Sequence, residues 1–244
     1  MTRIAIFVAL FVSLVAWPTT EVAASRVSPM SVSLEPFGRG SIARIQFGNT
    51  ADRDFPIEVR AFRGEISEEG DLILVPADED FLIFPPQLVV PPLEEQILRV
   101  QYVGEPDLDQ ARVYYISVRQ LPIELEEGTP QIQVTVTYNV FVNVEPDDVK
   151  ELARVDTIES ATREDEKGVS VRIVNDGDGM LTAGKKAWSL RGRTADGAVF
   201  EKDFTAAEMS VTIGVGVVAP GKARRFFVPL DPDVDPKTLT IRLD

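Results

Sequence analysis

The side chains with the clearest chemical character lie between Ile132 and Val144, where apolar and polar residues alternate. The apolar ones are Ile132, Val134, Val136, Tyr138, Val140, Val142 and Val144. Alternation with period two places the apolar side chains on one face of a β-strand. Such a strand supports association rather than catalysis, because an open backbone edge beside an apolar stripe can pair with another strand.

The length of this strand indicates that part of it extends beyond its own domain. Thirteen residues at about 3.4 Å each would span roughly 44 Å, whereas most strands need only about 5–6 residues. We expect Val140–Val144 to lie in the core of their own domain. We expect Ile132–Val136, which follow a polar connection, to be offered to another chain.

Residues that could support catalysis or metal binding are few. The chain has no histidine and no cysteine, which excludes Ser-His-Asp and Cys-His catalysis and the commonest zinc ligands. Glu124, Glu126 and Glu127 resemble an acid/base group, but we interpret them as solvated charges on a loop. Asp176-Gly177-Asp178-Gly179 has acidic residues suited to calcium, but lacks the rest of an EF-hand loop, and we predict a hairpin turn. We predict no catalytic residue, no cofactor and no metal site.

Composition and the N-terminus indicate an exported protein. Arg3 precedes an apolar run, Ile4–Trp17, and Val22-Ala23-Ala24 offers small residues for cleavage; this is typical of a signal peptide over residues 1–24. The run is shorter than the roughly 20 residues that a spanning helix needs, so we expect no membrane insertion of the mature chain and a periplasmic location. The formal charge of −14 argues against nucleic acid as a partner.

The remaining chain reads as an all-β protein of two domains, 25–146 and 147–244, because turn signals recur at short intervals without helical periodicity. The predicted strands of the first domain are Met30–Leu34, Ser41–Phe47, Phe55–Phe62, Phe81–Phe84, Gln96–Tyr102, Arg112–Gln120 and the long strand, with an acidic loop over Gly64–Asp71. Those of the second are Ala153–Ile158, Gly168–Val174, Trp188–Arg193, Val211–Val217, Arg224–Leu230 and Leu239–Leu243. Each domain is large enough to form its own core.

Once these strands are placed, the block from Asp80 to Val144 resembles the periplasmic chaperones of chaperone–usher pilus assembly. That family has a Phe-x-x-x-Pro-Pro element, a Leu-Arg-Ile-type strand and an aromatic-rich strand that ends in Ile-Pro or Leu-Pro. The matching residues here are Phe81, Pro85, Pro86, Leu98, Arg99, Val100, Tyr114, Leu121 and Pro122. The resemblance covers nearly the whole mature chain and is weaker in the second domain.

The resemblance implies two immunoglobulin-like β-sandwich domains set at an angle and a non-enzymatic function. The long strand would complete pilin-like subunits that lack a strand, with Ile132, Val134, Val136 and Tyr138 as the subunit-binding residues. An outer-membrane usher would be the second partner. Whether the free protein also caps its own edge by forming a dimer is left open.

The chain departs from the family at the residues that bind the terminal carboxylate of the subunit. Many members use an arginine in the first strand and a lysine in the long strand, and our alignment places Ser31 and Asn139 at these positions. An arginine that usually closes the long strand falls at Asn143. Anchoring by two cations therefore does not carry over to this chain.

Two other function classes compete with the chaperone. One is a structural or adhesive exported protein made of two immunoglobulin-like domains. Genes for an usher and a pilin next to the gene for this protein would favour the chaperone instead. The other is a glycosidase-like enzyme with paired carboxylates, for which no placed pair is evident.

Export generates the first prediction. If residues 1–24 are a signal peptide, the mature protein begins at or close to Ser25, and mass spectrometry of the periplasmic protein will find that N-terminus. Retention of Met1 in the periplasmic product would contradict it.

Overall fold

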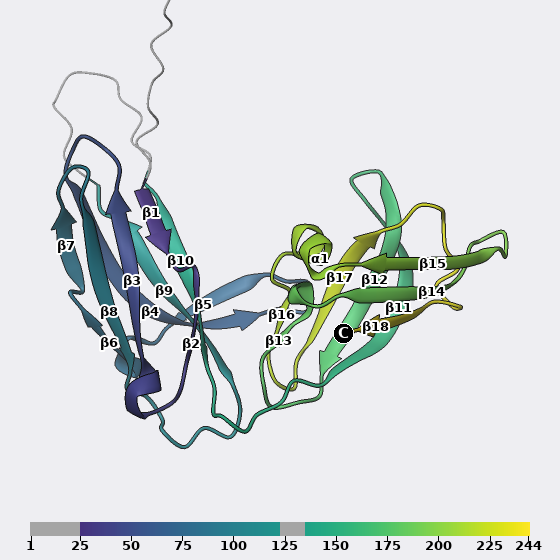
Figure 1. Ribbon diagram of the computed structural model, residues 1–244, viewed down its shortest axis with the longest axis horizontal. Helices are drawn as coiled ribbons and strands as arrows, with labels where there is room; N and C mark the ends of the chain where they lie inside the picture. Colours follow the sequence, from purple (N-terminus) through teal and green to yellow (C-terminus); the bar gives the residue numbers. More distant parts are fainter. Residues whose placement is uncertain (1–24, 123–134) are drawn as a thin grey trace, which may run out of the picture.

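The computed structural model describes residues 25–122 and 135–244, and these fold into two β-sandwiches joined by a short linker (Figure 1). Strands dominate, and the one α-helix in the described residues, α1, spans Ala206–Ile213. Short 3₁₀ turns are η1 (Gly38–Ser41), η2 (Asp78–Asp80) and η3 (Ala183–Lys185). The predicted fold class, two immunoglobulin-like sandwiches at an angle, is confirmed.

The first sandwich consists of two sheets, here called sheet A and sheet B. Sheet A contains, in spatial order, β1 (Ser25–Ser28), β3 (Ile42–Asn49), β8 (Glu95–Tyr102) and β6 (Phe81–Phe84). Sheet B contains β2 (Ser31–Leu34), β10 (Thr137–Val144), β9 (Arg112–Gln120), β4 (Phe55–Ile66) and β5 (Leu72–Pro76), with β7 (Gln87–Val90) beside the first part of β4. The N-terminal segment therefore contributes one strand to each sheet.

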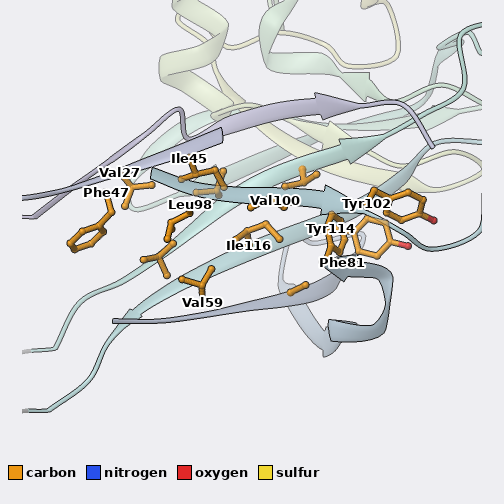
Figure 2. Packing of buried hydrophobic residues seen from close by; sticks show 14 of the residues in the cluster. Val27, Ile45, Phe47, Val59, Phe81, Leu98, Val100, Tyr102, Tyr114 and Ile116 are labelled. Carbon is orange, nitrogen blue, oxygen red and sulfur yellow. The ribbon is translucent and has the colours of Figure 1, made fainter. Parts of the chain in front are cut away.

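Side chains from both sheets form one core, shown in Figure 2. At one end of this core the ring of Phe81 meets the rings of Tyr102 and Tyr114 edge to face, with centroids 5.4 and 5.0 Å apart. Such aromatic pairs contribute about 0.5–1.5 kcal/mol beyond the burial of their area. The Tyr114 hydroxyl donates to Asp80 Oδ2 at 2.9 Å, which satisfies its polar atom.

The second sandwich has a similar plan. One sheet contains β11 (Ala153–Arg163), β12 (Glu166–Asn175) and β17 (Ala223–Pro229), and another contains β15 (Val199–Phe204), β14 (Trp188–Arg193) and β18 (Thr240–Leu243). A short pair joins β13 (Leu181–Thr182) to β16 (Val217–Val218). Trp188 is fully buried in this core and donates its indole N–H to the Ala183 carbonyl at 2.9 Å.

Most predicted strands occur in the structure, but three predictions are wrong. Val211–Val217 is not a strand, because α1 occupies its first part. Thr205 and Glu208 form a capping box that starts this helix, and that signal outweighs the apolar run. Gly64–Asp71 is not all loop, since β4 continues to Ile66. Asp176–Gly179 is not a hairpin turn, because β12 and β13, which it connects, belong to different sheets.

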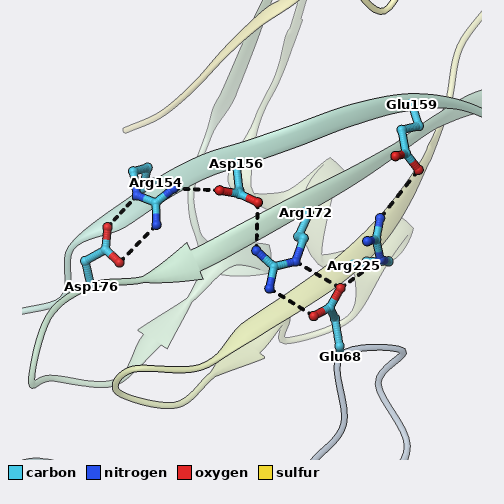
Figure 3. A network of polar contacts seen from close by, with 7 residues as sticks. All are labelled: Glu68, Arg154, Asp156, Glu159, Arg172, Asp176 and Arg225. Carbon is cyan, nitrogen blue, oxygen red and sulfur yellow. Dashed lines mark hydrogen bonds and ion pairs between the residues drawn. The ribbon is translucent and has the colours of Figure 1, made fainter.

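The two sandwiches touch through the hairpin between β4 and β5, and its tip carries Glu68. The Glu68 carboxylate accepts from Arg172 Nε at 2.9 Å and Nη2 at 3.0 Å, and it lies 2.8 Å from Arg225 Nε (Figure 3). The Arg225 backbone N–H also donates to the Glu68 carbonyl at 2.7 Å. Bidentate pairing of this kind fixes direction as well as distance.

Apolar contacts lie beside this ion pair. Val113 and Tyr115 of β9, with Phe141 of β10, pack with Met180 and Val217 of the second sandwich. The backbone N–H of Ala111 donates to the Asp178 carbonyl at 2.8 Å. The angle between the domains is therefore fixed by a small apolar cluster and by the contacts of Glu68.

Glu68 generates a prediction about domain orientation. The hydrogen bond from Arg172 and the nearby positive charges lower the pKa of Glu68, so its contacts are intact at neutral pH and are lost only as the pH falls through that lowered value. We expect Glu68→Gln to leave both sandwiches folded and to loosen their relative orientation, measured by small-angle scattering and ¹⁵N relaxation. Glu159→Gln is the matched control, because Glu159 pairs with Arg225 within the second sandwich. Equal effects of the two variants would contradict this role of Glu68.

Candidate functional site

The long strand predicted over Ile132–Val144 is β10, but in the described residues it begins at Thr137, since Thr135 and Val136 are not part of a strand. Only part of the outer edge of β10 is covered. β9 pairs with all of β10 on one side. On the other side, β2 pairs in parallel with β10 only from Phe141 to Val144. The segment from Thr137 to Val140 therefore has no strand on its outer side within the described part of the chain. This uncovered segment is called the free edge below.

The hydrogen-bond pattern shows which backbone groups the free edge presents. The Gln120 N–H donates to the Val136 carbonyl at 3.0 Å, so the even-numbered residues of β10 turn their backbone groups toward β9. The odd-numbered residues turn theirs outward, as the bond from Phe141 N–H to the Met30 carbonyl at 3.1 Å confirms. The free edge therefore presents the N–H and C=O groups of Thr137 and Asn139 to an incoming strand.

The side chains of β10 divide into a core part and an exposed part. Val140, Val142 and Val144 are fully buried, as predicted. Tyr138 is half-buried and packs against the same core, and its hydroxyl donates to the Ser25 carbonyl at 2.5 Å. Val136 is 37% exposed. The apolar stripe thus leaves the protein's own core between Tyr138 and Val136.

Ile132 and Val134 lie outside the described residues. The assignment of Ile132, Val134, Val136 and Tyr138 as contact residues stays a prediction. Tyr138 lies at the boundary of the first sandwich, because its ring packs against the core of that sandwich and its hydroxyl bonds to Ser25 of β1.

Ser31 and Asn139 lie near the inner end of the free edge. Ser31 lies opposite Phe141 in the parallel register and not opposite Asn139, so Ser31 and Asn139 do not form a cross-strand pair. Asn139 faces Ser117 of β9. The Oδ1 atoms of Asn139 and Asn143 are buried without a hydrogen-bond partner among the described residues. All these side chains are neutral.

The cations nearest to the free edge are already paired. Arg119 lies directly opposite Thr137 and forms an ion pair with Glu58 at 2.6 Å. Arg60, one strand further, pairs with Asp78 and holds the pKa of that carboxyl below its usual range. A strand that binds at the free edge therefore meets backbone groups and apolar surface, without an unpaired cation among the described residues.

The other residues considered in the sequence analysis that the structure describes take part in packing or in hydrogen bonds within the protein. Tyr115 packs between the sandwiches, where burial raises its pKa. The Lys150 backbone N–H donates to Asp178 Oδ1 at 2.7 Å, and Arg154 binds Asp176, so this acidic loop is occupied by the linker and its neighbours. Glu124, Glu126 and Glu127 lie outside the described residues. Within 25–122 and 135–244, no cluster of acidic side chains is arranged to hold a metal ion, and no helix has the length and apolar character to span a membrane.

Comparison with known proteins places the fold. No protein-family model matches the chain, and no curated protein matches its sequence. Solved structures do match, and they show that the chain has the fold of the two-domain immunoglobulin-like chaperones of chaperone–usher pilus assembly. The identities are low, so the likeness concerns the fold.

Three of these structures illustrate the match. CfaA, a class 5 fimbriae chaperone, matches with a TM-score of 0.54 at 13% identity, over 91% of this chain and 99% of that one. The complex of the Salmonella enterica SafA pilin with the SafB chaperone matches at 0.52 and 15% identity, over 86% of each chain. The complex of CsuC with the tip subunit CsuE, from archaic chaperone–usher pili of Acinetobacter baumannii, matches at 0.50 and 12% identity, over 84% of this chain and 91% of that one.

The free edge generates a prediction that needs no partner. In native-state hydrogen exchange, the amides of Tyr138 and Val140, which face β9, will be protected. Those of Thr137 and Asn139, which face outward, will exchange much faster. Equal protection of all four amides would show that the edge is covered in solution.

Proposed function

We propose that this protein is a periplasmic chaperone that binds pilin-like subunits by donor-strand complementation and delivers them to an outer-membrane usher. The observation that carries the proposal is the free edge of β10, which continues into the alternating stripe at Val136. The fold supports it, since complexes with the same fold contain a pilin or tip subunit beside the chaperone. The function is non-enzymatic binding.

The physical basis of binding is strand addition at the free edge. A subunit strand beside β10 would bond with the backbone groups of Thr137 and Asn139, while the apolar side chains at even positions enter the subunit's open core. Each aliphatic side chain buried in this way contributes about 1.5–3 kcal/mol. Several such side chains, together with the ladder of backbone hydrogen bonds, act against the costs of association.

The neutral inner end of the edge affects how the subunit is aligned. Serine and asparagine can donate to a terminal carboxylate, but more weakly than arginine or lysine. We therefore expect register to be set by the apolar side chains, since a slip of one residue would turn all of them to the wrong face.

The test is a charge placed in the stripe. Val134→Asp adds an ionised group where the proposal requires an apolar contact, and burial of that charge is costly. We expect the variant to fold normally and to lose the pilin-like subunit that co-purifies with the tagged wild-type protein from the periplasm, as identified by mass spectrometry. Thr135→Asp is the matched control, because it adds the same charge to the opposite face of the strand, and it should retain the subunit.

Two results would contradict the proposal. One is a wild-type protein that recovers no pilin-like subunit from a periplasm that contains them. The other is Val134→Asp binding the subunit as well as Thr135→Asp does. If Val134→Asp unfolds in isolation, Val134 belongs to the protein's own core.

A further inference from the structure

The outer face of sheet A carries exposed apolar side chains far from the free edge. The apolar contacts with the second sandwich come from β9 and β10 of sheet B, which leaves the outer face of sheet A outside that contact. Leu82 and Phe84 of β6 are 59% and 70% exposed, and Ile97 of β8 is 60% exposed. A folded protein that exposes three large apolar side chains on one sheet face has a candidate interaction surface there.

Two arginines lie next to these apolar residues. Arg44 of β3 and Arg99 of β8 are directly opposite each other in the antiparallel register, and Phe84 is opposite Arg99 on its other side. The row Phe84, Arg99, Arg44 therefore crosses three strands on one face. Both arginines are exposed, and neither forms an ion pair with a carboxylate of the described residues.

This arrangement is unfavourable for the isolated protein. Like charges directly opposite each other in a sheet destabilise the pair. The chain is rich in carboxylates, with a net charge of −14, yet the carboxylate on this face of β8, Glu95, is bound by Arg26 instead. Arginine and aromatic side chains are enriched in protein interfaces relative to the rest of the surface.

We propose that the outer face of sheet A, through Arg44, Arg99 and Phe84, binds an acidic segment of another protein that also carries apolar side chains. Carboxylates of the partner would pair with the two guanidinium groups, and its apolar side chains would cover Phe84, Leu82 and Ile97. Charge complementarity selects this partner, because pairing removes the repulsion between the arginines.

Two other occupants fit less well. A second copy that binds through the same face would bring four arginines together, since a two-fold interface places each residue near its own equivalents. An anionic membrane would attract the arginines but repel the rest of a chain with a charge of −14. A short protein segment with a few carboxylates would contact only this face, so the acidic remainder of the chain would not oppose its binding.

The test uses the mature protein and a synthetic peptide of alternating glutamate and leucine or phenylalanine, followed by amide chemical shifts. We expect shifts in β3, β6 and β8, weakening with added salt, and none with the analogue that has lysine for glutamate. The double variant Arg44→Glu/Arg99→Glu should weaken binding at least about tenfold, which corresponds to 1.4 kcal/mol. Arg53→Glu/Arg163→Glu, at exposed arginines away from this face, is the matched control and should bind as the wild type does.

Three results would overturn the proposal: shifts that map to β10 instead of sheet A, equal losses in both double variants, or binding that Arg44→Glu/Arg99→Glu leaves unchanged. Two further arms address the other occupants. Concentration-dependent dimers in sedimentation that this variant abolishes would assign the face to a second copy. Binding to phosphatidylglycerol vesicles that this variant abolishes would assign it to a membrane.

A stability measurement separates a binding role from a structural one. Because Arg99 faces another arginine, Arg99→Gln should melt at the same temperature as the wild type or higher, while peptide binding falls. A lower melting temperature would show that Arg99 serves folding, and the proposal would fail. Recovery of the pilin-like subunit through β10 should be unaffected by Arg44→Glu/Arg99→Glu, so failure here and failure of the proposed function are distinguishable.

Discussion

The division of the N-terminal segment between two sheets is the constraint on which the site depends. β1 pairs with β3 in sheet A, and the chain then crosses to sheet B, where β2 begins only at Ser31. Because β2 starts there, it covers β10 from Phe141 onward and leaves Thr137 and Asn139 open. A first strand that stayed in sheet B from Ser25 would cover the whole edge. The hydrogen bond between Tyr138 and Ser25 holds β1 at the point where the chain passes from sheet A to sheet B. Tyr138, the last residue of the stripe that packs in the core, therefore also helps to keep the edge of β10 open.

An open edge is useful only if the rest of the domain is rigid, and this chain has no disulfide to make it so. Each sandwich instead uses one buried asparagine. The Asn49 side-chain amide donates to the carbonyls of Arg53, at 2.8 Å, and Val90, at 3.0 Å. Asn175 makes the equivalent bonds to Gly179 and Val218, at 2.8 and 3.1 Å. Each unsatisfied carbonyl in such a buried place would cost about 1–3 kcal/mol, so one amide joins loops that the sequence separates widely.

Sequence patterns located the strands that have clear boundary signals. β6, β9 and β14 were predicted with their observed bounds. β6 and β9 are runs of apolar, β-branched and aromatic residues, and a proline-containing pair, Pro85-Pro86 or Leu121-Pro122, follows each of them. β5 was missed because its residues, Leu72–Pro76, are a run of apolar side chains without alternation on an edge. The start of α1 did have a signal, Thr205 followed three residues later by Glu208, which could have been read as a capping box.

The functional geometry was predictable only in part. The alternating stripe showed that a strand would leave its core, but not where, because the limit at Tyr138 depends on a hydrogen bond to a residue far away in the sequence. The contacts of Glu68 with Arg172 and Arg225 could not be inferred from spacing for the same reason. The register of Ser31 against Phe141 likewise could not be read from the sequence, because a shift of two residues preserves the alternation of apolar and polar side chains.

The two proposed surfaces belong to different sheets of one sandwich, and this separation has a consequence for assembly. The free edge belongs to sheet B, whose Tyr115 and Phe141 meet the second domain, while Arg44, Arg99 and Phe84 lie on the outer face of sheet A. The two sheets are packed on one fully buried core, so occupation of one surface does not cover the other. A subunit held through backbone and apolar contacts at β10 would therefore leave the cationic row free. A protein built in this way can hold one partner by an interaction that salt affects little and meet a second by one that salt weakens.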